Sequence, residues 1–398
     1  MLHIPTDKEL EQLQQVIEFY NNDYIVFRIT QTMLDKSTID ANTSIYKLLK
    51  NQEVFNFDDA VDGEKYYLQC SILLNTEVVE KKISLYRPEA KPHKAGDPRF
   101  WPYGLKSLVD EGSLVFLGVL NKKLILIPLI DEVISIPNLE ILFGKSSEST
   151  SPQLKKVIDF LRAYKDVWFP SVSKSKKNDK DVGETFEDLL EIPANNSKAA
   201  DMDGELELKT KRLASKTKDT LFCKVQDKKL SPVKTVRDII LNYGYQSNDS
   251  RRPEYIDLFV TVSTVPNAQG LLHKVNRNDE QLEQYHMADG VETLIAVWPF
   301  DILKDSLESK HPSTAWIGAE EKKEGGEIFF KYSQLNVTKT PLFQNFLLLI
   351  ESNKVVFEWR GGQHPVKGQA EPIDYGHAFR VSEKDRNFLF GSSQEYQI

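Results

Sequence analysis

Two polar, serine- and lysine-rich stretches near the middle of the chain limit what it can fold into. They are GKSSESTSPQ (144–153) and SVSKSKKNDKD (171–181). Segments of this composition rarely pack into a core, so they favour a boundary between folded parts. The length of 398 residues also exceeds one ordinary core and favours two or three domains. We therefore place a domain break across residues 145–181.

The residues before this break predict a short helix followed by a mostly β domain. From residue 23 to residue 136 the chain consists of short alternating or apolar runs, including YIVFRIT, KYYLQCSILL and SLVFLGVL, which are typical of strands. The apolar region 112–136 is interrupted by Asn121-Lys122-Lys123 and Asp131-Glu132. It therefore predicts buried strands joined by a turn and not a membrane span. Apolar residues recur at helical spacing within residues 1–20, at Leu10, Leu13, Val16, Ile17 and Tyr20.

The residues after the break predict a mixture of helices and strands. Helical patterns cover residues 153–169, 182–192, 233–244 and 340–352, and strand patterns cover 257–265, 291–300, 327–335, 354–360 and 377–382. This mixture favours an α+β fold with a mainly antiparallel or mixed sheet. We predict a multidomain α+β protein with a first domain at 1–147, a helix and linker at 148–181 and a second domain at 182–398.

Charge and cysteine content restrict the function classes. The net charge of −8 argues against nucleic acid for the chain as a whole. Residues 209–237, however, contain ten Lys or Arg and two Asp, a local charge of +8. This basic block is either a solvated face or a surface that binds phosphates. Cys70 and Cys223 form no metal or disulfide pattern, and the polar N-terminus is unlike a signal peptide, so we expect a cytoplasmic bacterial protein without a membrane partner.

The stretch DMDGELELKTK (201–211) predicts a candidate metal site. In a strand, Glu205, Glu207 and Lys209 share one face at a spacing of roughly 6.5–7 Å, and Leu206 and Leu208 point into the core. Asp201 or Asp203 lies at the strand entry, where Gly204 permits a bend. Two carboxylates suit Mg²⁺, and a nearby lysine suits hydrolysis of a phosphodiester. An amphipathic edge strand is the alternative interpretation of the same pattern.

Four motifs in order extend this pattern: GETFEDLLE (183–191), ELELKT (205–210), DTLFCK (219–224) and DYGHAFRV (374–381). They resemble the motifs of the MvaI/BcnI group of type II restriction endonucleases, which are related to the mismatch-repair nickase MutH. The resemblance covers residues 182–398. It implies a PD-(D/E)xK-type endonuclease fold with catalytic and recognition subdomains, and it implies Mg²⁺ as the cofactor.

The resemblance also implies roles for single residues. Glu207 and Lys209 match the catalytic Glu and Lys of the family. The metal-binding Asp is either Asp201 or Asp203, and we prefer Asp201, with Glu207 as the second metal ligand. Glu191 matches an acidic helper position, although it can also be a helix-end carboxylate in solvent. Lys224 resembles a lysine near the scissile bond, or it serves as a phosphate clamp.

A second cluster, FEWRGGQHPVKGQAEPIDYGHAFRV (357–381), predicts base contacts. Glu358 and Arg360 alternate on one strand, and Arg380 lies on another. Arginine can bind guanine O6 and N7 together, and a carboxylate can accept from cytosine N4. Glu358 and Arg360 are similar to an Asp-x-Arg pair of the family, with glutamate in place of aspartate. Asp374 and His377 fall where the family has a His-Asp-His run, whose flanking histidines are missing here. A surface ion pair is the alternative for each of these residues.

The first half resembles the B3-like DNA-binding pseudobarrel, found in the effector domain of EcoRII and in plant transcription factors. The resemblance lies mostly in residues 82–117. It implies two DNA-gripping loops, near 28–36 and at 87–99, with six candidate contact residues: Arg28, Lys36, Arg87, Lys91, Lys94 and Arg99. A protein-interaction module with an incidental basic loop is the alternative.

Together these resemblances imply a Mg²⁺-dependent type II restriction endonuclease for CCWGG- or CCNGG-type sites in double-stranded DNA. The first domain would bind a second copy of the site as an activator, as in type IIE enzymes, by tethering or by relieving a block. We expect a monomer with a cognate DNA methyltransferase in the same system. The alternatives are a MutH-like nickase and a DNA-binding regulator that does not cleave.

Overall fold

The structure is a computed structural model. It describes residues 5–20, 22–74, 77–89, 96–130, 134–144, 150–173, 178, 180–193, 199–391 and 393–398. The chain divides into two compact units, residues 1–146 and residues 147–398, except that the short segment 275–282 groups with the first. Among the helices in the described ranges, none has both the length and the apolar character needed to cross a bilayer.

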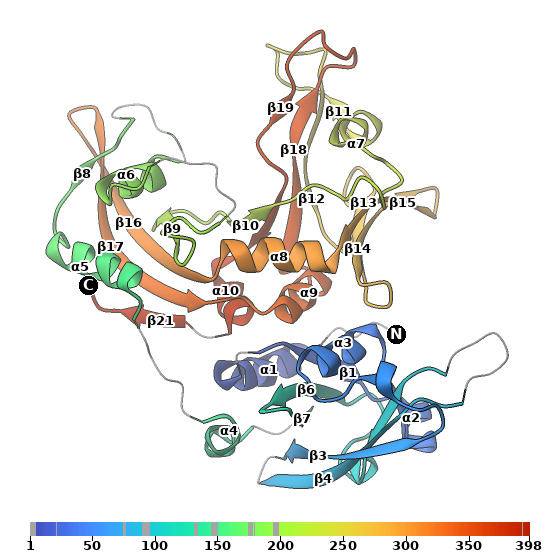
Figure 1. Ribbon diagram of the computed structural model, residues 1–398. Helices are drawn as coiled ribbons and strands as arrows, with labels where there is room; N and C mark the ends of the chain where they lie inside the picture. Colours follow the sequence, from blue (N-terminus) through green and yellow to red (C-terminus); the bar gives the residue numbers. More distant parts are fainter. Residues whose placement is uncertain are drawn as a thin grey trace. The chain divides into compact units, whose positions relative to one another are not determined.

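The first unit is built around one sheet of seven strands in the order β1-β6-β7-β3-β4-β5-β2. Its elements are α1 (Asp7–Phe19), β1 (Tyr24–Arg28), α2 (Gln31–Lys36), β2 (Ile39–Asp40), α3 (Thr43–Asn51), η1 (Phe57–Asp59), β3 (Lys65–Leu73), β4 (Val78–Tyr86), β5 (Arg99–Pro102), η2 (Leu105–Ser107), β6 (Leu114–Leu120), β7 (Lys123–Leu129) and α4 (Ile136–Phe143) (Figure 1). Neighbouring strands are antiparallel except β3 and β7. The mostly β character predicted for this half is confirmed.

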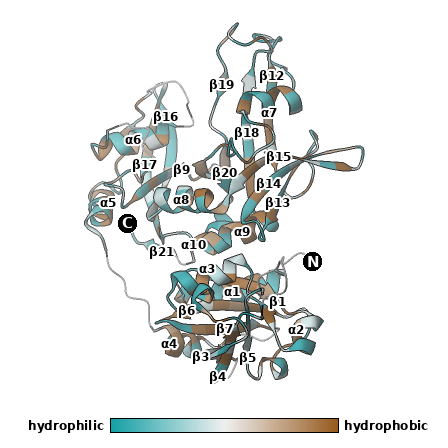
Figure 2. Ribbon diagram, turned by 45° about the vertical axis from the view of Figure 1, so that its right-hand side comes forward, coloured by the Kyte–Doolittle hydropathy of each residue, from teal (hydrophilic) through white to brown (hydrophobic). Residues whose placement is uncertain are grey.

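Local sequence sets the ends of these elements. Thr6 accepts a hydrogen bond from the backbone N–H of Glu9, and the Glu9 side chain accepts one from the backbone of Thr6, which forms a capping box at the start of α1. Asn121 and Lys122 have φ values of 51° and 61°, as a two-residue hairpin between β6 and β7 requires. This confirms the turn predicted within residues 112–136. Consecutive residues of β6 and β7 are buried, so both faces of the sheet are covered there. Figure 2 colours the ribbon by hydropathy and shows the apolar character of the central strands of this sheet.

One sheet of the second unit has the strand order β21-β17-β16-β9, with β8 beside β17. Its strands and the two helices packed with it are α5 (Pro152–Ala163), β8 (Phe169–Pro170), α6 (Asp181–Leu189), β9 (Glu207–Arg212), β16 (Ser313–Glu324), β17 (Glu327–Lys339) and β21 (Ser393–Tyr396). Apolar residues of α5 and α6 share one buried core with β9, β16 and β17. Strand β9 pairs in parallel with β16, and α6 lies against β9. The helix and the strand therefore form one rigid platform.

The rest of the second unit contains a sheet in the order β10-β20-β18-β12-β11, with β19 beside β18, and a three-stranded sheet β13-β14-β15. The elements are β10 (Asp219–Cys223), α7 (Val236–Tyr243), β11 (Tyr245–Gln246), β12 (Ile256–Val262), β13 (Leu271–Asn276), β14 (Gln281–Ala288), β15 (Val291–Pro299), α8 (Phe300–Lys310), α9 (Phe343–Glu351), β18 (Val355–Gln363), β19 (Ile373–Asp374), β20 (Ala378–Val381) and α10 (Glu383–Phe390). On β18, buried Phe357 and Trp359 alternate with half-buried Glu358 and Arg360. One face of this sheet is therefore polar. The α+β character predicted for the second half is confirmed.

Two helices are shorter than the sequence pattern predicts. The pattern at 153–169 continues through apolar residues beyond Ala163, but α5 ends there because Phe169 and Pro170 pair with β17 as strand β8. The pattern at 182–192 likewise ends early, since α6 stops at Leu189. Residues 148–181, predicted as a helix and linker, thus supply α5 and β8 to the second unit. Within them, 174–177 and 179 lie outside the described residues, as do 148 and 149.

Candidate active site

Strand β9 carries the predicted Glu-x-Lys pair, Glu207 and Lys209. Lys209 Nζ lies 2.6 Å from Glu207 Oε1. The alternating residues Leu206 and Leu208 are buried, as the pattern predicted. Glu207 is also buried, at 1% exposure, whereas 28% of the Lys209 side chain is exposed. The strand begins at Glu207 and not at Glu205, which is exposed in the preceding turn, so the prediction that Glu205 shares this strand face is wrong.

Asp201, and not Asp203, lies beside Glu207. Asp201 Oδ2 accepts a hydrogen bond of 2.9 Å from the backbone N–H of Leu208. Asp203 is exposed in a turn with a φ of 55°, and its side chain contacts Gln153 at 3.3 Å. Gly204, with a φ of 73°, continues the same left-handed turn, where glycine avoids steric strain. The turn directs the two aspartates to different surroundings.

A second lysine, Lys310 at the end of α8, bridges the two carboxylates. Its Nζ atom lies 2.9 Å from Glu207 Oε2 and 3.5 Å from Asp201 Oδ1. The next residue, His311, is fully buried, and its ring nitrogens lie 2.8 Å from Thr314 Oγ1 and 2.9 Å from a backbone carbonyl of β10. Burial lowers the pKa of His311 to about 3. The neutral ring therefore fixes the end of α8 and, with it, the position of Lys310.

The acidic residue of α6 that lies near this cluster is Glu187. Burial raises the pKa of Glu187 above its usual value, and the negative charge of Asp201 adds to the shift. A Cβ atom added to Gly183, one turn earlier, would lie 3.2 Å from Thr210 Oγ1 of β9. The helix therefore approaches the strand closely on this side. We call Glu187, Asp201, Glu207, Lys209 and Lys310 the carboxylate cluster.

Glu191, the residue predicted for this role, lies elsewhere. It follows the end of α6, is exposed, and has a φ of 57°. The sequence interpretation extended the helix to 192 and so placed Glu191 on it. The spacing of Gly183 and Glu187, one helical turn apart, is the sequence signal that marks the side of α6 facing β9.

The donor chemistry of the carboxylate cluster fits Mg²⁺. Burial raises the pKa of Glu207 above its usual value; Asp201 adds to this, and the two lysines oppose it. A divalent cation would offset the same crowding of negative charge. Within the described residues no group of three acidic, histidine or cysteine side chains could hold a metal. The protein ligands would therefore be Asp201 and Glu207, and Mg²⁺ commonly keeps several waters beside one or two carboxylates.

The polar face of β12, β18 and β20 carries the predicted base-contacting residues. We call Phe259, Thr261, Glu358, Arg360 and Arg380 the reading face. Arg380 Nη1 lies 2.8 Å from Glu358 Oε2, so these two charges compensate each other. In the described part of the chain, no carboxylate lies within ion-pair distance of Arg360. Its guanidinium group is thus available to a ligand.

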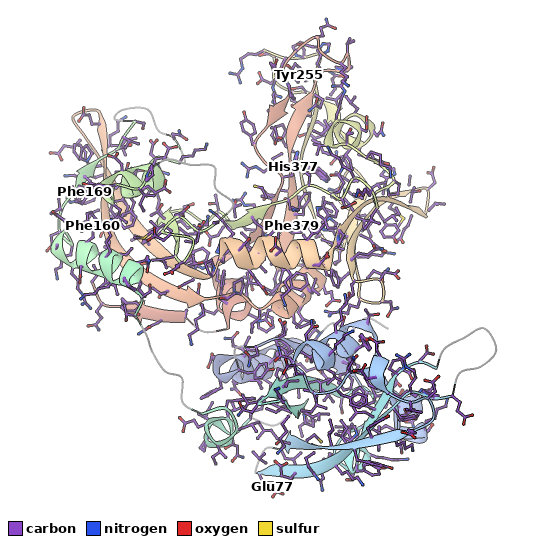
Figure 3. All side chains as sticks on the ribbon, in the orientation of Figure 1. Glu77, Phe160, Phe169, Tyr255, His377 and Phe379 are labelled. Carbon is purple, nitrogen blue, oxygen red and sulfur yellow. The ribbon has the colours of Figure 1, made fainter. Side chains whose placement is uncertain are left out.

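His377 and Asp374 are neighbours that differ in exposure, with His377 Nε2 3.8 Å from Asp374 Oδ1. His377 is 2% exposed, and its Nδ1 accepts a 3.0 Å hydrogen bond from the backbone N–H of Arg360. Its ring centroid lies 4.7 Å from that of Trp359. Figure 3 labels His377 within the second unit. Burial lowers the pKa of His377. The imidazole therefore lies behind the reading face and supports the backbone of Arg360, while Asp374 is exposed and accepts a hydrogen bond from the N–H of Gly376.

Part of the basic block at 209–237 is bound within the protein. Lys211 pairs with Asp219 at 3.1 Å, and Arg212 pairs with Glu321. Lys224 is half-buried. Its backbone N–H donates to the carbonyl of His377, the residue before β20, at 3.0 Å. Four lysines of the block are exposed: Lys216, Lys228, Lys229 and Lys234. These four are better placed to meet a phosphate than the ion-paired residues.

A family model for the MvaI/BcnI restriction endonuclease family matches residues 158–390, more than half of the chain. The chain belongs to the MvaI/BcnI restriction endonuclease family. It is similar to a solved structure of restriction endonuclease MvaI in complex with cognate DNA substrate, with 24% identity and a TM-score of 0.52 over 62% of this chain and 99% of that chain. MvaI without DNA matches at 23% identity and a TM-score of 0.39, over 63% and 99% of the two chains. No curated protein matches.

Membership of the MvaI/BcnI family confirms the resemblance predicted from the four motifs. The fold of the MvaI structure confirms the restriction endonuclease fold for the second half. Lys310 of this family member was missed, because it lies far from the motifs in sequence and reaches Glu207 only through the packing of α8. The B3-like assignment of the first unit stays a prediction.

In the first unit of this MvaI/BcnI family member, Arg28 is bound within the fold. Its Nη1 and Nη2 atoms lie 2.7 and 2.8 Å from the two carboxylate oxygens of Glu9. Nη1 also donates to the carbonyl of Gly112 at 2.8 Å. A bidentate pair of this kind is geometrically specific. Arg28 therefore ties α1 to β1, and the nearby Lys36 on α2 is exposed.

The other predicted contact residues of the first unit lie near its β4–β5 connection. Arg99 Nε is 3.0 Å from Asp40 Oδ1, and Arg87 Nη2 is 3.8 Å from Asp58 Oδ1. Both arginines thus have an acidic neighbour, although the Asp40 and Asp58 side chains are largely exposed. The two remaining candidates, Lys91 and Lys94, lie outside the described residues.

Proposed function

We propose that this chain is a Mg²⁺-dependent type II restriction endonuclease that hydrolyses double-stranded DNA at a CCWGG- or CCNGG-type site. The observation that carries the proposal is the presence of the carboxylate cluster and the reading face in one compact unit. The thiol of Cys223 on β10 lies within electrostatic range of both sets: burial raises its pKa, and the charges of Arg360, Lys209 and Arg380 oppose that shift. One bound duplex would thus meet both sets of residues.

The residues of the cluster divide the work of hydrolysis. Asp201 and Glu207 would hold Mg²⁺, which when bound activates water and offsets phosphate charge. Lys209, the more exposed cation, would lie beside the scissile phosphate and stabilise the additional negative charge that develops there. Lys310 holds Asp201 and Glu207 together and so positions the two carboxylates. Glu187 adds a third acidic group at the edge of the site.

The reading face supports a site that contains G·C pairs. Arg360 and Arg380 would donate to guanine O6 and N7, and Glu358 would accept from cytosine N4. Asp374, exposed at the end of β19, would contact a base or a bound water. Lys224 and the exposed lysines of the basic block would contact phosphates, which position the duplex without reading its sequence.

For the first unit we propose a B3-like role in binding a second copy of the site. The support is its single seven-stranded sheet with basic residues at Lys36, Arg87 and Arg99. This combination of domains resembles that of the CCWGG nuclease UbaLAI. A second bound site would activate cleavage either by tethering DNA near the catalytic unit or by relieving a block on it. We further propose a cytoplasmic monomer that acts beside a cognate methyltransferase.

Two alternatives remain as competing proposals. A MutH-like nickase would use the same carboxylate cluster but cut one strand only. A DNA-binding regulator would use the reading face without cleavage. The close approach of Lys209 and Lys310 to Glu207 favours an enzyme. In hydrolysis Glu207 would hold the metal, Lys209 would stabilise phosphate charge and Lys310 would position the carboxylate.

Plasmid digestion in Mg²⁺ tests the proposal, with substrates that carry zero, one or two CCWGG sites. We expect discrete double-strand cuts only where a site is present, and faster cutting with two sites. Nicked circles as the end product would favour the nickase. Binding without any cutting would favour the regulator. Equal cleavage rates with one and two sites would support the endonuclease assignment and contradict the activator role of the first unit.

A further inference from the structure

An aromatic side chain stands among the polar residues of the reading face. Phe259 of β12 is 36% exposed and lies directly opposite Arg360 of β18 in the strand register. Thr261, the next residue on this face, lies opposite Glu358. With Val260 and Trp359, these four residues line a hollow of about 270 Å³. Exposing a phenylalanine ring to water is unfavourable, so a position at the centre of a ligand-binding face suggests a contact with the ligand.

A second ring extends the same apolar surface. Tyr375 is 64% exposed, and its ring centroid lies 6.0 Å from that of Phe259. The backbone N–H of Tyr375 donates to the carbonyl of Arg360 at 3.0 Å. The two rings and the guanidinium group of Arg360 are therefore attached to one rigid part of the sheet.

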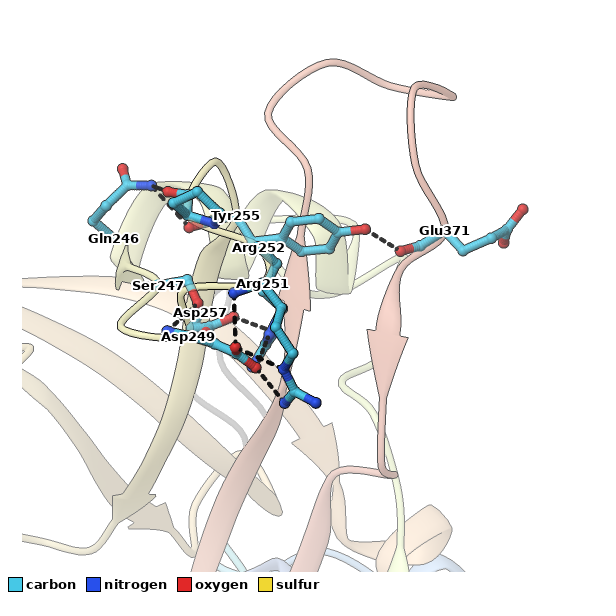
Figure 4. Close-up of polar contacts among 9 residues, drawn as sticks. Gln246, Ser247, Asp249, Arg251, Arg252, Tyr255, Asp257 and Glu371 are labelled. Atoms are coloured by element: carbon cyan, nitrogen blue, oxygen red, sulfur yellow. Dashed lines mark hydrogen bonds and ion pairs between the residues drawn. The ribbon is translucent and has the colours of Figure 1, made fainter.

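The ring of Phe259 is supported by a charged network. The guanidinium carbon of Arg252 lies 5.8 Å from the ring centroid, a distance typical of a cation–π contact. Arg252 is held by Asp249 at 3.3 Å and by buried Asp257 at 2.8 Å (Figure 4). At Gly362 an added Cβ would lie 2.4 Å from Asp257 Oδ1, so the network needs a glycine there. The aromatic ring is thus fixed in place before any ligand arrives.

The major groove offers one kind of apolar group to such a ring. Thymine presents its C5-methyl group there, whereas the other base edges present hydrogen-bond donors and acceptors. A 5-methylcytosine carries the same group. Opposite residues of paired strands lie about 4.5–5.5 Å apart, and bases on one DNA strand rise by about 3.4 Å per step. A ring opposite Arg360 therefore reaches a base next to the one that Arg360 contacts.

We propose that Phe259, supported by Tyr375 and Arg252, binds the 5-methyl group of a pyrimidine adjacent to the guanine contacted by Arg360. This inference rests on the proposed function and specifies how the reading face selects its DNA. The methyl group comes from thymine, such as that of the central pair of a CCWGG-type site, or from a methylated cytosine. In either case the contact adds apolar selectivity to the hydrogen bonds of Arg360 and Glu358.

Single-position base analogues test this proposal with the full-length chain. Each thymine of the cleaved site is replaced in turn by deoxyuridine, which lacks the methyl group, and each cytosine by 5-methylcytosine. Binding is measured by competition in the Lys209→Ala background, and cleavage by the unsubstituted protein is measured in parallel. We expect one position at which the methyl group strengthens binding roughly fourfold, the effect of burying one such group. A loss with deoxyuridine identifies thymine, and a gain with 5-methylcytosine identifies methylated cytosine.

Variants of Phe259 connect the effect to the ring. Phe259→Ser should remove the methyl preference, and Phe259→Leu should keep most of it because an apolar side chain remains. Val366→Ser, at another exposed apolar residue of the second unit, is the matched control and should leave the preference unchanged. A methyl effect at no position, or one that persists in Phe259→Ser, overturns the inference. If the protein cuts no duplex at all, the proposed function fails instead, so the two failures are distinguishable.

Discussion

The carboxylate cluster and the reading face differ in how far the protein itself compensates their charged side chains. In the cluster, Glu207 is buried and has two lysines within 3 Å, so its charge is compensated inside the protein. On the reading face, Arg380 is paired with Glu358, but no carboxylate among the described residues compensates Arg360. The first arrangement prepares a reaction centre, and the second leaves a hydrogen-bonding group for a partner. The difference indicates which substitutions should affect chemistry and which should affect selection of DNA.

Removing Lys209 should have the largest effect on activity. We expect Lys209→Ala to reduce cleavage at least about 100-fold, in line with the loss of one group that stabilises transition-state charge. Binding of the site should be retained, because Lys209 belongs to the cluster and not to the reading face. Single-turnover cleavage and binding titrations measure the two effects. Lys304→Ala, on the same helix as Lys310, is the control; if it lowers cleavage as strongly as Lys209→Ala, the assignment of Lys209 is wrong.

Glu187 and Glu191 provide a sharper test of where the cluster ends. Glu187→Gln should reduce cleavage about tenfold, because it removes a negative charge close to Asp201 without changing side-chain size. Glu191→Gln should leave the rate unchanged, since Glu191 is exposed beyond the end of α6. Thermal unfolding of both variants checks that the fold is intact. If Glu191→Gln lowers the cleavage rate and Glu187→Gln does not, the acidic role first predicted for Glu191 is restored.

Arg360 tests the reading face. Arg360→Ala should lose about 1–3 kcal/mol of discrimination at one guanine, with little change in stability, because no ion pair is broken. Arg360→Lys keeps the charge but not the planar fork, so it should recover phosphate attraction without recovering discrimination. Binding to duplexes with each guanine substituted measures this effect. An equal loss on every sequence would make Arg360 a phosphate contact.

The contrast also explains how much the sequence could predict. Alternation along one strand predicted that Glu207 and Lys209 share a face and that the leucines are buried. Side-chain direction in a strand follows from position alone, so this could be predicted from sequence. The turn after Asp201, with a glycine at 204, was also visible locally. Lys310 and Glu187 were not predicted, since their places depend on how α8 and α6 pack against β9. His377 was expected to contact DNA because it lies in a motif, and only the packing of Trp359 against it placed the ring behind the sheet.

The role of a single basic residue is harder to predict than side-chain direction on a strand, because it depends on which elements pack beside it. A basic residue that pairs with an acidic group of the fold is less available to DNA than one without such a partner. Arg28 illustrates this, because its partner Glu9 lies on α1, a separate element. The basic composition near residue 28 predicts a DNA contact, and the structure adds an ion pair to Glu9 within the fold; the DNA contact stays a prediction.

Arg28 gives the smallest expected effect and extends the comparison to the first unit. If Arg28 serves the fold, Arg28→Ala should leave DNA binding unchanged but destabilise the contact of α1 with β1 by about 1–2 kcal/mol, since a hydrogen bond to a charged group is lost. Hydrogen exchange of α1 amides in the full-length chain should become roughly tenfold faster. Burial alone would raise the pKa of Glu9, but hydrogen bonds from Arg28 and Thr6 lower it below its usual value.

The stabilisation from this pair should therefore depend on pH in a definite direction. A carboxylate with a lowered pKa stabilises the fold above its pKa in the unfolded chain, and this stabilisation is lost as the pH falls through the folded value. The difference in exchange between the original protein and Arg28→Ala should thus be largest near neutral pH and shrink in acid. Glu11→Ala, at an exposed position on the same helix, should produce neither effect. Weaker DNA binding by Arg28→Ala, with unchanged exchange in α1, would instead return Arg28 to the DNA-contacting loop.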